Sequence, residues 1–197
     1  MKLLHLVTLC ILLSFNAAAQ RNILNGIIYF PADSVISATD TLGVEMPQKN
    51  KPVRLVSNPY TARQKIKEKI EPQIIDSLVL WNRTAPSLTH ALEYIHPYGW
   101  CWLLDRGAHI SIYNYSPKGY YIGGNGGMWA KNKSVILVKK GNTFHRFTKT
   151  FKLANNKFRE RLAALVADDP VLVKMILQSS FLREKTLRML SLYSPAI

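Results

Sequence analysis

One cysteine and four histidines beyond the first twenty residues could bind a metal ion or act as a nucleophile and its base. They are His90, His96, Cys101, His109 and His145. A metal site needs such side chains clustered at fixed spacings, but these five are scattered and no paired carboxylates stand beside them at helical spacing. The sequence therefore predicts no metal site and no cofactor.

Cys101 and His109 are close enough in sequence to suggest a thiol and its base, but strand pairing should separate them. The segment "YGWCWLLDRGAHISIYNY" places two strand-like runs around a turn in which Gly107 could take a positive φ. With Arg106 and Gly107 as the loop, the apolar side of this hairpin carries Cys101, Leu103, Ile110 and Ile112. The opposite side carries Trp100, Trp102, His109 and Tyr113. We therefore expect Cys101 to be buried and unreactive.

The stretch "GYYIGGNGGMWAKNKS", residues 119–134, has the glycine content of a phosphate-binding loop. Such a loop needs a strand before it and a helix after it. Here a β-branched run, Ser134 to Val138, follows, and the turn Lys140-Gly141-Asn142 comes next. Neither Gly-Lys-Ser/Thr nor Gly-x-Gly-x-x-Gly occurs, so we expect Gly123 to Gly127 to be a flexible connection between strands.

Other catalytic patterns are equally weak. The chain has no Gly-x-Ser-x-Gly, and Glu93 and Asp105 are isolated carboxylates that do not define a glycosidase pair. We therefore expect a protein that is not an enzyme.

The elements that would position these residues change in type along the chain. Residues 22–56 alternate short apolar runs with Gly and Pro, which is typical of strands and turns, and "QIIDSLVLWN" predicts a buried strand. Residues 60–70 and 87–96 fit a helix and a strand equally well, and the sequence leaves them open.

Beyond Phe151 the apolar spacing becomes helical. Phe158, Leu162 and Leu165 share one helical face, and Asp169-Pro170 has the pattern of an N-cap followed by proline at the first helical position. The sequence therefore predicts an α+β fold, an antiparallel β-sheet and hairpin core covered by C-terminal helices. We expect residues 20–150 to be β-rich and residues 151–197 to be the helical segment, together one compact domain.

The first nineteen residues have the pattern of a signal peptide. Lys2 precedes an apolar run from Leu3 to Phe15, and three alanines then provide a cleavage site before Gln20. Cys10 lies inside the apolar run, so it is not expected to carry lipid. We therefore expect a mature, exported protein that begins at Gln20, is periplasmic, surface-bound or secreted, and has no transmembrane span.

The formal net charge is +14, and the cations are spread along the chain. Nucleic acid is not an expected partner outside the cytoplasm. Anionic glycans or lipid head groups are the natural counterparts of such a surface.

Aromatic residues provide the one candidate ligand site. Trp100, Trp102 and Tyr113 line up on one side of the hairpin, where we expect the C-terminal helices to bury them, Trp102 included, as a second core. Trp129, beside the glycines, is the ring expected to stay exposed. The residues proposed for ligand binding are Tyr120, Tyr121, Trp129, Lys131 and Lys133.

Three segments carry a resemblance to known proteins. With "GWCWLLDRGAHISIYNY", "GYYIGG" and "FRERLAALVADDPVLVKMI", the chain resembles uncharacterised exported proteins of the Bacteroidota. These share a signal peptide, a strand-rich middle and a C-terminal helical segment. The resemblance implies the compartment and the architecture but no activity.

The sequence thus favours an exported, envelope-associated binding module with a basic surface. The alternative is a small hydrolase acting on envelope or dietary polymers. A deep cleft that held Cys101 or a histidine within hydrogen-bonding reach of a carboxylate would favour the hydrolase.

Overall fold

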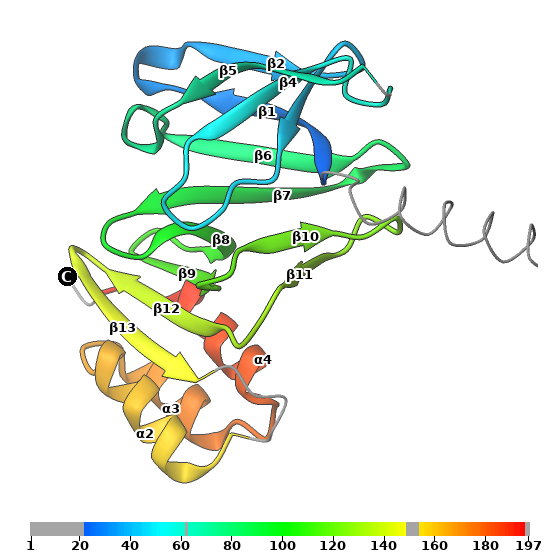
Figure 1. The fold of residues 1–197 in the computed structure, drawn as a ribbon. Coiled ribbons are helices and arrows are strands. Elements are labelled where there is room, and N and C mark those ends of the chain that lie inside the picture. Colours follow the sequence, from blue (N-terminus) through cyan, green and yellow to red (C-terminus); the bar gives the residue numbers. More distant parts are fainter. Residues whose placement is uncertain (1–21, 62, 149–153, 196–197) are drawn as a thin grey trace, which may run out of the picture.

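The computed structural model describes residues 22–61, 63–148 and 154–195. The expected signal peptide, the terminus at Gln20 and the boundary near residue 150 lie outside this part of the chain. The described residues form antiparallel strands followed by three short helices, so the fold is α+β (Figure 1).

Eleven strands form one long sheet. They are β1 (Ile23–Tyr29), β2 (Val35–Ala38), β3 (Leu42–Glu45), β4 (Val53–Ser57), β5 (Lys65–Ile70), β6 (Ser77–Asn82), β7 (Ala85–Ile95), β8 (Gly99–Arg106), β9 (Ile110–Tyr115), β12 (Val135–Lys140) and β13 (Thr143–Thr148). Their order is β13-β12-β9-β8-β7-β6-β1-β3-β4-β5, and β2 also pairs with β1. Most neighbours in the sheet are also neighbours in sequence, since antiparallel pairs need only short turns.

Two segments that the sequence left open are strands. Residues 65–70 form β5, which is exposed except at Ile70, and the whole of residues 87–95 lies within β7. β5 pairs with β4, and β7 pairs with β6 and with β8 over part of its length, and this pairing decides what local periodicity could not. The strand predicted in "QIIDSLVLWN" begins at Ser77, after a 3₁₀ turn at Pro72–Ile74.

A separate hairpin, β10 (Tyr120–Ile122) and β11 (Met128–Ala130), connects β9 to β12. Its inward residues Tyr120, Ile122 and Met128 are buried in one cluster with Trp100 and Leu92 of the sheet. This hairpin, rather than the helices, therefore packs over the tryptophan side of β8. Trp100 is 1% exposed, whereas Trp102, which we expected to be buried, is only partly buried against the same cluster.

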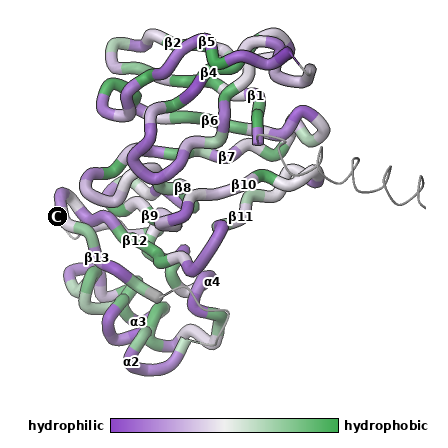
Figure 2. The backbone as a smooth tube through the Cα atoms, viewed as in Figure 1, coloured by the Kyte–Doolittle hydropathy of each residue, from purple (hydrophilic) through white to green (hydrophobic). Residues whose placement is uncertain are grey.

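The helical segment contains α2 (Asn156–Ala163), α3 (Pro170–Gln178) and α4 (Arg183–Arg188), with 3₁₀ turns at Ala164–Val166 and Met189–Leu192. The side chain of Asp169 accepts a hydrogen bond from the backbone N–H of Leu172, and Pro170 follows it, which confirms the predicted N-cap. Figure 2 shows hydrophobic and hydrophilic residues alternating along α2 and α3, as expected for helices with one buried face.

The helices pack on the sheet at one end only (Figure 1). Phe158 and Leu162 of α2 lie in one buried cluster with Ile110, Ile112 and strand residues of β12 and β13. The expectation that they would cover the tryptophan rings is therefore wrong. Their partners are the isoleucines that the sequence assigned to the other side of the hairpin.

The strand register explains this exchange. The β8–β9 hairpin exists, but Trp102 pairs with Asn114 and Leu103 with Tyr113, and the register shifts between Leu103 and Asp105. Because a bulge moves every following side chain to the opposite face, Cys101 shares its face with Tyr113 and Leu137 and not with the two isoleucines.

Gly107 is required for a different reason from the one predicted. It is not among the glycines with positive φ. A Cβ atom at Gly107 would lie 2.2 Å from the backbone oxygen of Ser191 in the last 3₁₀ turn. Glycine is needed there because the backbone of the helical segment passes directly against the β8–β9 turn.

In the described part of the chain, no helix has both the length and the apolar composition needed to cross a membrane.

Candidate functional site

An aromatic pair lies exposed on the β10–β11 hairpin, which we call the aromatic ribbon (Tyr120–Ile122 with Met128–Ala130). Tyr121 and Trp129 pair directly across the two strands. Because side chains alternate along a strand, both rings point away from the core and are 42% and 53% exposed. The predicted exposure of Trp129 is confirmed.

Tyr120 has the opposite orientation, so its assignment to the ligand site is wrong. It is 1% exposed, and its hydroxyl donates to the backbone oxygen of Asn114 and accepts from the backbone N–H of Ser116 at 3.0 Å. Burial also raises the pKa of this phenol above its usual value. Tyr120 anchors the ribbon and cannot contact a ligand.

The glycine turn, Gly123 to Gly127, joins the two strands of the ribbon. Three of its carbonyl oxygens are bonded by side chains of the β6–β7 hairpin. Asn82 Nδ2 donates to Gly123 O at 3.0 Å, Thr84 Oγ1 donates to Gly124 O at 2.7 Å, and His90 Nε2 lies 2.7 Å from Gly126 O. The predicted connection between strands is confirmed, and these three contacts hold it against the β6–β7 hairpin.

Two glycines of this turn are needed for close contact. Gly126 has φ +80°, and a Cβ there would lie 2.6 Å from the Cβ of Ala85. A Cβ on Gly127 would lie 3.3 Å from Nε1 of Trp129, so the indole extends along the turn. The backbone thus supports one edge of the exposed ring and limits its freedom.

Two exposed lysines follow the ribbon in the chain. The backbone N–H of Lys131 donates to Gly119 O at 3.0 Å, which extends the ladder by one more pair. Strand alternation then places Lys131 on the same side as Trp129, two residues away. Lys131 and Lys133 are both exposed.

Beyond Gly119 lies an open hollow with more cations, which we call the lysine hollow. Its volume is about 270 Å³. Its lining residues are Gln48, Lys49, Asn50, Lys51, Pro117 and Lys118. Three of the six are lysines and none is acidic, so this surface is electrostatically positive.

The loop from Pro47 to Pro52, between β3 and β4, forms one wall of the lysine hollow. Trp100 holds it twice, by its backbone N–H to Lys49 O at 2.9 Å and by its indole Nε1 to Lys51 O at 3.3 Å. Lys49 has φ +28°, a region that glycine occupies more readily than lysine. Because Trp100 lies in the core, the loop is fixed to the centre of the sheet.

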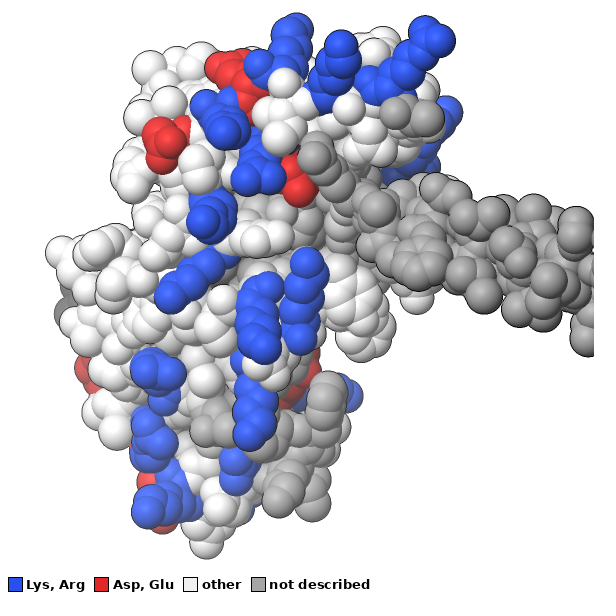
Figure 3. Space-filling model, in the orientation of Figure 1, with Lys and Arg blue, Asp and Glu red and all other residues white. Residues whose placement is uncertain are grey.

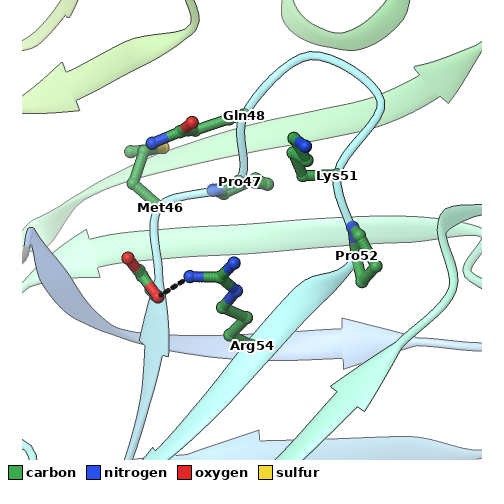
Figure 4. A pocket seen from close by; sticks show the side chains of 7 residues that line it. Met46, Pro47, Gln48, Lys51, Pro52 and Arg54 are labelled. Carbon is green, nitrogen blue, oxygen red and sulfur yellow. Dashed lines mark hydrogen bonds and ion pairs between the residues drawn. The ribbon is translucent and has the colours of Figure 1, made fainter. Parts of the chain in front are cut away.

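A second, smaller recess lies on the other side of this loop (Figure 4). Figure 4 shows Gln48 and Lys51 on the two arms of the loop and Arg54 turned toward a carboxylate. That carboxylate is Glu45, whose Oε2 is 3.4 Å from Nη1 of Arg54. Of the two cations that line this recess, Arg54 is therefore already paired, and Lys51 also lines the lysine hollow.

Sequence reasoning missed the lysine hollow. Lys49 and Lys51 stand between Pro47 and Pro52, a signal that predicts a tight, exposed loop carrying cations. What the sequence could not show is that Lys118, from the β9–β10 connection, lies across from them.

The candidate nucleophile has no catalytic setting. Cys101 is fully buried, and its Sγ is 3.5 Å from the Gly99 carbonyl oxygen. Burial, with a smaller contribution from nearby Glu93, raises the pKa of the thiol to about 12. A thiol with this pKa is protonated at neutral pH and unreactive.

Glu93 is also committed to a structural contact. Its carboxylate accepts a hydrogen bond from the Tyr113 hydroxyl at 2.7 Å and pairs with Arg106. Burial first, and the Glu93 contact second, raise the pKa of Tyr113 to about 12. With one hydrogen bond and one ion pair, the Glu93 carboxylate is occupied by structural partners.

The histidines do not converge on one centre. His109 and His145 both border an open hollow beside Lys140 and Tyr193, while His90 is bonded to the glycine turn. Within the described ranges, no group of three or more His, Cys, Asp or Glu side chains is arranged to hold a metal ion.

Comparisons with protein-family models, curated proteins and solved structures found no match to this chain.

Proposed function

We propose that this protein is an exported, non-catalytic module that binds a glycan of the cell envelope through the outer face of the aromatic ribbon. The observation that carries the proposal is the cross-strand pair Tyr121 and Trp129, two large rings exposed on a ribbon whose other face is core. Planar rings held beside polar groups are a common platform for sugars and other flat ligands.

Rigidity supports this function over a chance exposure of apolar side chains. The glycine turn is bonded to Asn82, Thr84 and His90, and Tyr120 fixes the other end of the ribbon. A ligand would therefore meet rings whose positions are largely set before binding, and it would lose less free energy in ordering them.

The charge of the surface suits an anionic partner. The formal net charge is +14, and Figure 3 shows Lys and Arg side chains extending over this face from β5 to the helical segment, with few Asp and Glu between them. Such a field attracts polyanions and raises their rate of association.

Export is part of the proposal and rests on the sequence of residues 1–19 and on the resemblance to exported proteins of the Bacteroidota. Intact mass of the protein purified from its native envelope tests it. A chain beginning at Gln20 with no added acyl mass is expected, and retention of residues 1–19 would contradict it.

Binding is tested by electrophoresis in gels that contain a polysaccharide, where a bound protein is retarded. Trp129→Ala should weaken retardation by an anionic polysaccharide at least about tenfold, since a central aromatic contact is often worth more than about 1.4 kcal/mol. Tyr121→Ala should weaken it less, because the phenol ring is smaller.

Phe181→Ala is the matched control, since Phe181 is a similarly exposed ring on the helical segment, 51% against 53% for Trp129. It should bind as the unaltered protein does. Equal loss in both variants would show that exposed apolar rings act non-specifically, and turnover of the polymer by the purified protein would favour the hydrolase instead.

A further inference from the structure

The lysine hollow lies next to the aromatic ribbon and is connected to it by backbone. Lys118 in the wall of the hollow precedes Gly119, and Gly119 pairs with Lys131 on the ribbon. Tyr121 is three residues beyond Lys118, and because the chain turns at Lys118 and Gly119, their Cα atoms lie within about 10 Å of each other. A single extended ligand can therefore reach both features.

The two features offer different chemistry. The ribbon presents ring faces, whereas the hollow is lined by Lys49, Lys51 and Lys118, with no carboxylate among its six lining residues. Like charges gathered around one concave space repel one another unless an anion lies between them. An ammonium group also forms stronger hydrogen bonds to a charged oxygen than to a neutral one.

The backbone that carries two of these lysines is fixed to the core. Both Lys49 and Lys51 have carbonyl oxygens bonded to Trp100, whose side chain is 1% exposed. Lys49 keeps a positive φ, a conformation that is unfavourable for a residue with a Cβ. Residues with strained backbone conformations of this kind are found most often at binding and active sites.

We infer that the lysine hollow is the anion-binding subsite of the glycan site. It binds a sulfate, phosphate or carboxylate group of an acidic polysaccharide whose sugar ring stacks on Tyr121 and Trp129. This inference rests on the proposed function. It adds that the ligand is acidic and that its anionic group lies close to the sugar ring that stacks on the ribbon.

The test compares two variants with the same net charge. Lys49→Gln/Lys118→Gln removes two cations from the hollow, and Lys157→Gln/Lys174→Gln removes two exposed lysines from α2 and α3. Because long-range attraction depends on total charge, any difference between them reports the hollow itself. The probes are dextran sulfate, polygalacturonate, neutral dextran and phosphatidylglycerol vesicles.

The hollow variant should bind the acidic polysaccharides at least about tenfold more weakly at about 0.1 M salt, while the control changes by about twofold or less. The slope of log affinity against log salt should decrease by about two for the hollow variant, one for each lost contact. Binding of neutral dextran should be equal in both variants.

The outcomes separate this inference from the function on which it rests. If Trp129→Ala loses polysaccharide binding while the hollow variant matches its control, the ribbon binds glycan but the hollow is not its anion subsite. If the protein binds vesicles and none of the polysaccharides, both proposals are wrong and the basic face binds lipid head groups.

Discussion

Substitution of Gly107 by alanine tests how the helical segment sits on the sheet. The added Cβ would lie 2.2 Å from Ser191 O, 2.8 Å from Ser191 C and 2.9 Å from Ser191 Cα, all of them backbone atoms. No side-chain rotation can relieve these contacts, so either the β8–β9 turn or the 3₁₀ turn at Met189–Leu192 must move. Overpacking of this kind costs about 1–3 kcal/mol.

The matched control is Gly124→Ala, in the glycine turn, where the added Cβ meets nothing within 4 Å and φ is outside the left-handed region. That change should stabilise slightly, by about 0.4–1 kcal/mol, because alanine restricts the unfolded chain. The two variants should therefore differ by about 1.5–4 kcal/mol in free energy of unfolding, or roughly 1–2 M in urea midpoint.

Urea unfolding followed by circular dichroism measures this difference directly. Equal midpoints for the two variants would show that the 3₁₀ turn does not lie against the hairpin. The arrangement of the helical segment on β9, β12 and β13 would then need revision.

Three further outcomes follow from contacts described above. Trp100→Ala should lower the free energy of unfolding by roughly 3–5 kcal/mol, and Trp129→Ala by less than about 1 kcal/mol, in urea titrations; similar losses would contradict the assignment of inner and outer rings. The Tyr193 hydroxyl first, and Lys140 with it, lower the pKa of Asp168 below 3.8, so its stabilising contribution is present above that pH and is lost as the pH falls through the folded-state pKa. Asp168→Asn should therefore lower the melting temperature at pH 6 and match the unaltered protein in strong acid; a constant difference at all pH values would exclude this linkage. Iodoacetamide should label Cys101 only after unfolding, as a thiol pKa of about 12 requires, and rapid labelling of the native protein would refute its burial.

Local patterns predicted the elements well wherever one signal dominated. The turn at Gly141-Asn142 joins β12 to β13 with Gly141 at φ +56°, and Asp169-Pro170 begins α3. In both cases the residues that define the element are adjacent in sequence. Trp129 was predicted exposed for a similarly local reason, its position beside the glycines, and it is exposed.

The sequence could not predict the strand register or the contacts between residues far apart in the chain. The register of β8 with β9 depends on a longer turn and on a bulge near Leu104, neither of which leaves a clear local signal. The bulge adds one residue to β8, so the side chains of β8 before it share a face with different residues of β9 than predicted. This is why the helices were expected over Trp100 instead of over Ile110 and Ile112. The same limit hid the approach of Lys118 to Lys49, which come from distant parts of the chain.

The aromatic ribbon lies in the connection between β9 and β12, two strands that pair with each other. The chain leaves β9 at Tyr115 and re-enters the sheet at Val135, and these two residues pair directly. Substitutions at outward positions of the ribbon, such as Tyr121 and Trp129, therefore leave the pairing of β9 with β12 untouched. Evolution could alter what this surface recognises, residue by residue, while the inward side chains preserve the fold, much as variable loops diversify on a constant scaffold.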